Sequence, residues 1–225
     1  MHSREWSDVA VDVKICGLTR VEDAALAAAH GAWRLGVIFA GGPRVRTEAE
    51  AIEIVAAAGG VPVMGVFGSQ SVNEILAIAA RVRLSGVQLH GPSTAADASR
   101  LRLAGLEVWR IARVPIESAA QLAVAAEEAD LLLLEPTAPG DQPAAGGRGV
   151  GIGLDEARTA RGLVPQGVRV GLAGGLTPDR LAEAVRIVGP DAVDVSSGVE
   201  IAPGIKDPDR LIRFLEIARD AFPAA

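Results

Sequence analysis

The sequence contains little cysteine, few aromatic residues and no excess of positive charge. Cys16 is the single cysteine in 225 residues, which excludes an intramolecular disulfide and a metal cluster built from thiolates. Lysine and arginine number 22 against 28 aspartates and glutamates, a formal net charge of -6. The chain therefore has no overall excess of basic residues to neutralise the phosphates of a nucleic acid, and we expect no nucleic-acid partner. Aromatic residues make up 3% of the chain, so no aromatic patch indicates a protein partner.

Long apolar runs are missing as well. Residues 1–11 carry scattered charges without the apolar segment of a secretory signal, and the uncharged residues 54–70 are interrupted by Gly59, Gly60 and Pro62. A membrane span needs roughly 20 predominantly apolar residues. The sequence predicts a cytoplasmic protein with no membrane partner, in which residues 1–10 form an N-terminal extension.

From residue 11 onward, short apolar runs alternate with longer Ala-rich amphipathic segments. Eight such runs are predicted as strands: 12–16, 35–39, 61–67, 86–89, 107–112, 131–134, 168–173 and 192–195. Continuous apolar strands joined by helices indicate a parallel sheet that is covered on its faces. Because there are eight and no linker divides the chain, we predict a single-domain (β/α)8 TIM barrel over residues 11–225.

The segments between the strands carry signals for helix starts. The predicted N-terminal caps or first-turn residues are Thr19, Thr47, Ser71, Ser93, Ser118, Pro178 and Asp207. The stretch 136–153, rich in glycine and proline, is predicted as a long loop after the sixth strand. Loops of that length are usually functional or disordered.

Active sites of such barrels lie at the C-terminal ends of the strands, so candidate active-site residues are sought there. The polar residues and glycines at these places are Cys16, Arg44, Gln88, His90, Glu135, Gly174, Gly175, Ser196, Ser197 and Gly198. No group of His, Cys, Asp and Glu has the spacing of metal ligands.

Six segments stand out along the chain: VKICGLTR (13–20), PRV (43–45), VQLHG (87–91), LAGGLTP (172–178), DVSSGVE (194–200) and PGIKD (203–207). In this order they closely resemble phosphoribosylanthranilate isomerase of tryptophan biosynthesis. The resemblance covers residues 13–218. It implies an aldose–ketose isomerase that carries out an Amadori rearrangement of N-(5-phosphoribosyl)anthranilate, a small phosphorylated sugar, without cofactor or metal.

By this resemblance, Cys16 is the general base and the carboxylate at the end of the sixth strand is the general acid. A thiol needs a lowered pKa for this role, and Lys14, on the same side of the strand, is one candidate cause. The family has Asp where this chain has Glu135. The longer side chain leaves open a compensating backbone shift, a reduced activity, or an acid elsewhere, with Asp130 and Asp141 as the nearby alternatives.

The resemblance also assigns substrate contacts. Arg44 is predicted to bind the anthranilate carboxylate as a bidentate pair, with Arg46 as a weaker alternative. Gln88 and His90 point toward the aromatic side of the substrate.

Backbone groups of glycine-rich loops are predicted to hold the phosphate. The residues assigned to this are Gly149, Gly151, Gly174, Gly175, Ser197 and Gly198. Gly146 and Gly147 are an alternative match, and Arg148 could add a cation.

Two other functions stay open at this point. A related phosphosugar enzyme would need a catalytic lysine near a strand end, and the chain offers only Lys14 and Lys206. A barrel that binds a phosphorylated ligand without catalysis is the second, because Glu135 and the loop after the sixth strand depart from the family. Both a monomer and a homodimer fit the sequence.

Overall fold

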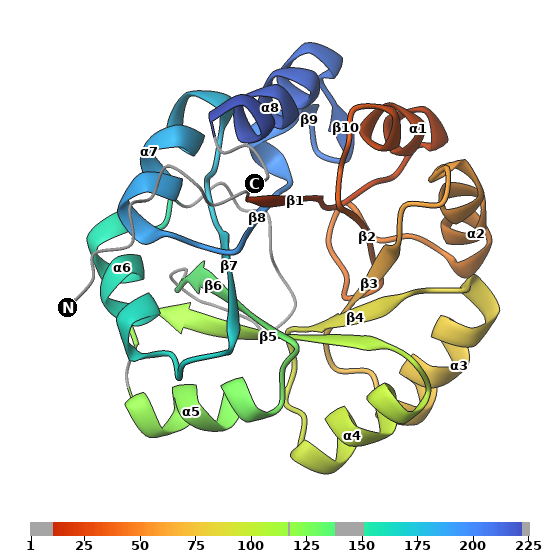
Figure 1. The fold of residues 1–225 in the computed structure, drawn as a ribbon. Coiled ribbons are helices and arrows are strands. Elements are labelled where there is room, and N and C mark those ends of the chain that lie inside the picture. Colours follow the sequence, from red (N-terminus) through yellow and green to blue (C-terminus); the bar gives the residue numbers. More distant parts are fainter. Residues whose placement is uncertain (1–10, 117, 138–150, 222–225) are drawn as a thin grey trace.

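The computed structural model describes residues 11–116, 118–137 and 151–221, and these form a closed barrel of parallel strands (Figure 1). Each strand is paired with its sequence neighbour, and β1 pairs with β8 to close the ring. The strands are β1 (Asp12–Ile15), β2 (Arg34–Ile38), β3 (Val63–Phe67), β4 (Gly86–Leu89), β5 (Glu107–Val114), β6 (Leu131–Pro136), β7 (Arg169–Ala173) and β8 (Ala192–Val195). The predicted (β/α)8 barrel is confirmed. The proposed extension, residues 1–10, lies outside the described residues.

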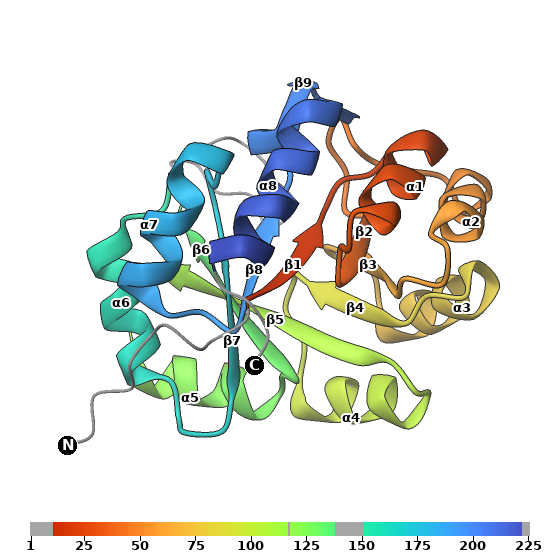
Figure 2. The ribbon, with the colours of Figure 1, turned by 45° about the horizontal axis from the view of Figure 1, so that its top comes forward.

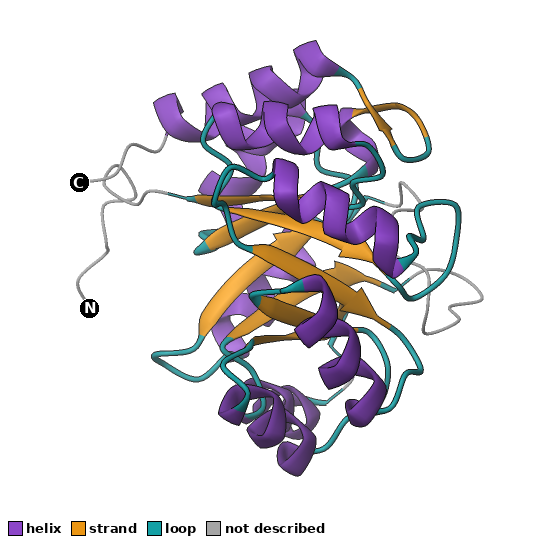
Figure 3. Cartoon of the chain, turned by 90° about the vertical axis from the view of Figure 1, so that its right-hand side faces the viewer, coloured by secondary structure: helices purple, strands orange, loops and turns teal. Residues whose placement is uncertain are grey.

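Helices follow the strands and cover the outside of the barrel (Figure 3). They are α1 (Val21–Ala29), α2 (Glu48–Ala57), α3 (Val72–Val82), α4 (Ala95–Leu103), α5 (Ala119–Glu127), α6 (Leu154–Leu163), α7 (Pro178–Val188) and α8 (Pro208–Ala221). No described helix is long and apolar enough to cross a membrane.

The predicted helix starts are mostly confirmed. Thr47 and Ser71 each accept a hydrogen bond from the backbone three residues on and form a full capping box with a glutamate. Two predictions are wrong by one residue. Thr94, not Ser93, caps α4, and α1 begins after Arg20, while the Thr19 hydroxyl donates to the carbonyl of Gly204.

The apolar core has two parts that the barrel wall separates. The larger lies between strands and helices, and it includes buried residues of every helix. The smaller fills the barrel interior, where Met64, Trp109, Leu131 and Leu133 are fully buried. Because side chains fill the interior, the barrel is solid and functional groups are displayed only at its ends.

An aromatic stack lies at the N-terminal end of the strands. The rings of Trp33 and Trp109 lie 5.8 Å apart, and the guanidinium groups of Arg34 and Arg169 lie 4.0 and 4.8 Å from the Trp33 ring. Asp12 and Glu107 accept hydrogen bonds from these two arginines. This end of the barrel is therefore closed by packing, and the opposite end remains for chemistry.

The chain after β8 adds elements that the sequence did not predict. A short 3-10 helix, η2 (Ser197–Val199), leads into an antiparallel hairpin of β9 (Glu200–Ala202) and β10 (Ile205–Lys206). Pro203 and Gly204, with Gly204 at φ +84°, form the turn. The hairpin lies beside α8 and α1 (Figure 2), and the amide of Lys206 donates to Asp23 of α1. It thus ties the last loop of the barrel to the first.

Candidate active site

Cys16 lies directly after β1 and is 5% exposed. Its amide donates to the carbonyl of Val195, the last residue of β8. The neighbouring strand supplies Gly36, at which a Cβ would lie 2.9 Å from the Cys16 sulfur and 3.1 Å from Nζ of Lys14. A residue larger than glycine at position 36 would displace both side chains. The prediction that Lys14 and Cys16 point into the barrel is confirmed.

Lys14 is fully buried beneath Cys16 and has three partners. Its ammonium group donates to Asp194 Oδ1 at 3.0 Å and to Gln88 Oε1 at 2.9 Å, and it lies 5.4 Å from the centre of the Trp109 ring. β1 and β8 pair Lys14 with Asp194 across the closing ladder. Burial acts to lower the pKa of Lys14, but Asp194 and Cys16 outweigh it and the pKa is raised. Lys14 is therefore a fixed cation at the floor of the site.

The expected lowering of the Cys16 pKa is not what the structure shows. Burial is the largest influence on the pKa of the Cys16 thiol and raises it, and Asp194 raises it further. Lys14 and Lys206 act in the predicted direction without outweighing these two. The sequence identified the cation beside the thiol but not the depth of burial, so Cys16 is a thiol in the unliganded protein at neutral pH.

Glu135 lies inside β6 rather than after it, because the strand extends to Pro136. The residue is 7% exposed, and its side chain accepts a hydrogen bond from Arg113 Nη1 at 2.8 Å through Oε2. His90 Nδ1 lies 3.9 Å from the same oxygen. Glu135 also contributes to raising the pKa of Asp194, although burial is the largest cause. The carboxyl group is thus a buried member of the site rather than a solvated strand-end residue.

The alternative acids are not placed as well as Glu135. Asp130 precedes β6, at the opposite end of that strand, where it accepts hydrogen bonds from Arg102 and from the amide of Val108. Asp141 lies outside the described residues. The described part of the chain therefore offers Glu135 as the carboxylate at this end of β6.

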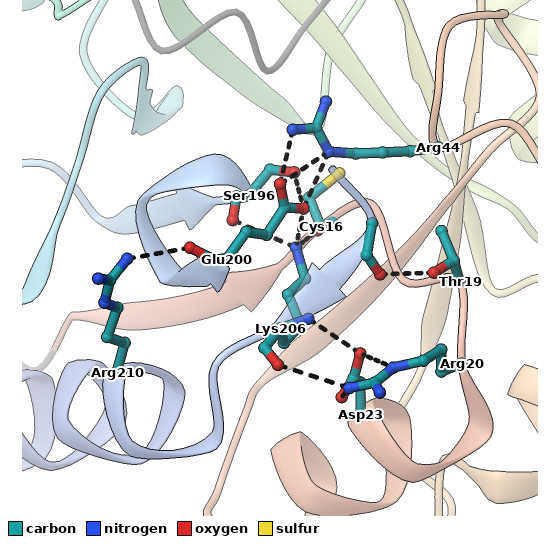
Figure 4. A network of polar contacts seen from close by, with 10 residues as sticks. Cys16, Thr19, Arg20, Asp23, Arg44, Ser196, Glu200, Lys206 and Arg210 are labelled. Carbon is teal, nitrogen blue, oxygen red and sulfur yellow. Dashed lines mark hydrogen bonds and ion pairs between the residues drawn. The ribbon is translucent and has the colours of Figure 1, made fainter. Parts of the chain in front are cut away.

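Arg44 is buried in an ion pair that the sequence did not predict. Figure 4 shows the Glu200 carboxylate between Arg44 and Lys206. Arg44 Nε and Nη2 donate to Glu200 at 2.9 and 2.6 Å, and hydrogen bonding to Glu200 raises the pKa of Arg44. The expected bidentate pair is therefore formed with Glu200 in the unliganded protein. Arg46, the weaker alternative, pairs with Glu50 of α2.

Lys206 joins this pair to the loops on either side. Its ammonium group, fully buried, donates to Glu200 Oε1 at 2.9 Å, to the Cys16 carbonyl at 2.6 Å and to the Ser196 carbonyl at 3.2 Å (Figure 4). One side chain thus connects the ends of β1 and β8 with the residue that holds Arg44. Burial lowers the pKa of Lys206, and Glu200 opposes this.

The glycines predicted to hold a phosphate gather at the ends of β7 and β8. Gly174 and Gly175 follow β7, and a Cβ at Gly198, on η2, would lie 1.7 Å from the Leu176 carbonyl oxygen, so only glycine lets the two loops pack together. Ser197 begins η2. Gly151 lies beside Arg180 of α7, which donates to the Gly175 carbonyl. Gly149, with the alternative Gly146, Gly147 and Arg148, lies outside the described residues.

Comparisons with known proteins agree with this geometry. The model of the N-(5'-phosphoribosyl)anthranilate (PRA) isomerase family matches residues 13–217. The chain belongs to this family. An N-(5'-phosphoribosyl)anthranilate isomerase of Paramagnetospirillum magneticum is 39% identical over 219 residues, covering 95% of this chain and 99% of its own.

Solved structures of phosphoribosylanthranilate isomerases have the same fold. That from Thermus thermophilus is 34% identical with a TM-score of 0.77, covering 91% of this chain and 96% of its own. A further phosphoribosylanthranilate isomerase structure, 28% identical with a TM-score of 0.74, is a complex with reduced 1-(o-carboxyphenylamino)-1-deoxyribulose 5-phosphate and covers 93% of this chain and 99% of its own.

Four residues of this site carried no predicted role in the isomerase reaction: Arg113, Asp194, Glu200 and Lys206. Asp194 pairs with Lys14 inside the barrel. Glu200 and Lys206 lie in DVSSGVE and PGIKD, two segments that carried the resemblance. Charged residues inside such motifs were the available signal for a buried network. Arg113 had no signal, because the predicted fifth strand stopped at residue 112.

Proposed function

We propose that this isomerase converts N-(5'-phosphoribosyl)anthranilate into 1-(2-carboxyphenylamino)-1-deoxyribulose 5-phosphate, with Cys16 as general base and Glu135 as general acid. The observation that carries the assignment is the polar cluster inside one barrel end, where Asp194 interacts electrostatically with both Cys16 and Glu135. The reaction needs one group that donates a proton and one that accepts a proton, and the cluster contains both.

The first step opens the furanose ring. Protonated Glu135 gives its proton to the ring oxygen, the bond from C1′ to that oxygen breaks, and the anthranilate nitrogen becomes part of a cationic iminium. Burial of Glu135 keeps competing water away from the transfer. Arg113, which bonds Glu135 Oε2, stabilises the carboxylate that the step leaves behind.

The second step removes the C2′ proton. The Cys16 thiolate takes it, the electron pair moves toward the iminium nitrogen, and the resulting enolamine tautomerises to the aminoketose. Burial raises the pKa of Cys16 in the unliganded protein, so the thiolate must form in the complex. The positive iminium next to the sulfur, together with Lys14 and Lys206, favours the thiolate there.

Arg44 and the glycine loops hold the two ends of the substrate in this proposal. Glu200 contacts Arg44 Nε and Nη2, so Nη1 is the nitrogen that we assign to the anthranilate carboxylate. Backbone amides of Gly174, Gly175, Ser197 and Gly198, with Gly149 and Gly151, take the phosphate. His90 stays a predicted contact for the aromatic ring. Gln88 is 2% exposed and its amide contacts Lys14 and His90, which supports a role in holding these side chains.

The substrate is a small phosphorylated sugar, and the proposed chemistry uses neither cofactor nor metal. We propose a cytoplasmic site of action, in keeping with a single free thiol whose chemistry requires the reduced form. The assembly stays a prediction of a monomer or a homodimer.

Loss of substrate fluorescence on turnover tests the proposed function. Purified protein should convert enzymatically generated phosphoribosylanthranilate, and Glu135→Gln should lower kcat by roughly 10²-fold or more, the usual contribution of a general acid. Glu135→Asp, which restores the family residue, should keep or raise the rate. Equal rates for Glu135→Gln and the unchanged protein would move the acid to another residue. Binding of the aminoketose without turnover would favour the phosphate-binding barrel instead.

A further inference from the structure

We propose that Lys14 and Gln88 fix the tautomer of His90, so that the proton on His90 Nδ1 points at Glu135 Oε2. His90 then acts as a positioning residue for the general acid. This inference rests on the role of Glu135 given above, but its geometry stands on contacts of the unliganded protein. A series of polar contacts leads from Lys14 at the floor of the barrel through Gln88 and His90 to β6.

The first link fixes the orientation of the Gln88 amide. The Lys14 ammonium group can only donate hydrogen bonds, so the group of Gln88 that faces it at 2.9 Å must be the oxygen, Oε1. Lys14 itself cannot turn away, because it is fully buried and also bound to Asp194 at 3.0 Å. The NH₂ group of Gln88 therefore points in the opposite direction, toward His90.

The second link fixes the proton on the imidazole. Gln88 Nε2 lies 2.9 Å from His90 Nε2, and an amide NH₂ can only donate. His90 Nε2 must accept that hydrogen bond and carries no proton. In a neutral imidazole the proton is then on Nδ1. The side chain is 3% exposed, so the amide rather than water decides the tautomer.

The third link reaches the acid. His90 Nδ1 lies 3.9 Å from Glu135 Oε2, which is longer than a hydrogen bond, and such contacts often tighten only when the substrate binds. Arg113 Nη1 donates to the same oxygen at 2.8 Å. Two donors therefore face Oε2, and the fixed tautomer directs one of them, the N–H of His90 Nδ1, at the carboxyl group.

The tautomer can be read directly by long-range ¹H–¹⁵N correlation spectra of the histidine rings. Only His2, His30 and His90 contribute, and the His90→Gln spectrum identifies the signals of His90 by their loss. We expect a protonated Nδ1 and an unprotonated Nε2 in the unchanged protein. The same is expected in Glu135→Gln, because Lys14 and Gln88 still fix the tautomer there. A proton on Nε2 in the unchanged protein overturns the proposal.

Gln88→Glu is the matched variant, because it keeps the size of the side chain and replaces the donor by an acceptor. Glutamate still accepts from Lys14, but it requires a proton on His90 Nε2, so the Nε2 signal should become that of a protonated nitrogen. The proposal fails if this variant folds and leaves Nε2 unprotonated. The spectra need no turnover, so an inactive protein refutes the proposed function and leaves the tautomer readable.

Kinetics separate positioning from packing. Asparagine places its amide near the Nδ1 position of histidine, whereas glutamine places it near Nε2. We expect His90→Asn to retain at least about tenfold more kcat than His90→Gln, the loss for one hydrogen bond to a charged group. KM should differ little between the two. Equal kcat values in the two variants would remove His90 from the positioning of Glu135.

Discussion

Replacing Glu200 by glutamine removes the one negative charge between two buried cations. The Glu200 carboxylate receives hydrogen bonds from Arg44 at 2.9 and 2.6 Å and from Lys206 at 2.9 Å, and its side chain is 4% exposed. Glutamine keeps the size of the side chain, but it has one acceptor oxygen in place of two and carries no charge. Arg44, 5% exposed, and Lys206, fully buried, would then lose the carboxylate that they share.

The expected loss of stability is large. Removing one partner of a buried ion pair costs about 3–5 kcal/mol, because the remaining charge stays buried. An unfolding entropy of about 2.1 cal/mol/K per residue gives ~0.5 kcal/mol/K for a chain of this size. The melting temperature should therefore fall by about 6–10 °C, and kcat should fall with it as Arg44 loses its support.

Calorimetry and urea unfolding measure this loss, and Glu48→Gln is the control. Glu48 forms an equally close pair with Arg81, at 2.5 and 2.7 Å, but on the exposed surface. Exposed pairs contribute little, so the control should melt almost as the unchanged protein does. A fall of less than about 2 °C for Glu200→Gln would refute the reasoning, since it corresponds to only ~1 kcal/mol.

The pH dependence gives a second check on the same pair. Burial acts to raise the pKa of Glu200, but Arg44 and Lys206 outweigh it and lower the pKa below its ordinary 4.5. A carboxylate with a lowered pKa in the folded state stabilises the fold above the unfolded value, and this contribution disappears as the pH falls through the folded value. The difference between Glu200→Gln and the unchanged protein should be constant above pH 4.5 and shrink below it.

Three further predictions concern other parts of the molecule. Because burial raises the pKa of Cys16 above its ordinary 9.0, iodoacetamide should label this single thiol slowly at pH 7, and the labelling rate should still rise above pH 9. Mass spectrometry measures the labelling rate, and a rate that stops rising below pH 8 would contradict the raised pKa. Gly36→Ala, whose Cβ would lie 2.9 Å from the Cys16 sulfur, should lower kcat by roughly tenfold or more, as displacements of about 1 Å do at active sites. An unchanged kcat would show that Cys16 and Lys14 can move aside without loss of catalysis. Trp33→Ala should lower the free energy of unfolding by about 1–3 kcal/mol, through loss of the ring stack and the two cation–π contacts, and should leave kcat unchanged because it lies at the far end of the barrel.

Apolar runs predicted the barrel because a strand that is buried on both faces consists of consecutive apolar residues, which the sequence shows directly. The predicted strands 86–89 and 192–195 match β4 and β8 residue for residue. Strand ends were less certain: β6 includes Glu135 and Pro136 because pairing with β5 continues to Val114 and Pro136. Where β6 ends depends on how far β5 pairs with it, and the residues of β6 alone do not predict this. The β9–β10 hairpin was missed because its strands are only three and two residues long.

The candidate residues of the site were accessible from motifs, but their interactions were not. Arg44 and Glu200 are 156 positions apart, so nothing in the sequence indicates that they form a buried pair. The direction of the Cys16 pKa shift depends on the balance between burial and two lysines, one of them 190 positions away. Such balances come from the folded structure alone.

The measurement that tests the central claim most directly is the turnover of Cys16→Ala with phosphoribosylanthranilate, beside Cys16→Ser as the variant of similar size. If the Cys16 sulfur takes the C2′ proton, both variants should fold and bind the aminoketose product, while kcat falls by roughly 10²–10⁴-fold. Full activity in Cys16→Ala would contradict the account, because no thiol would then be available to act as the base.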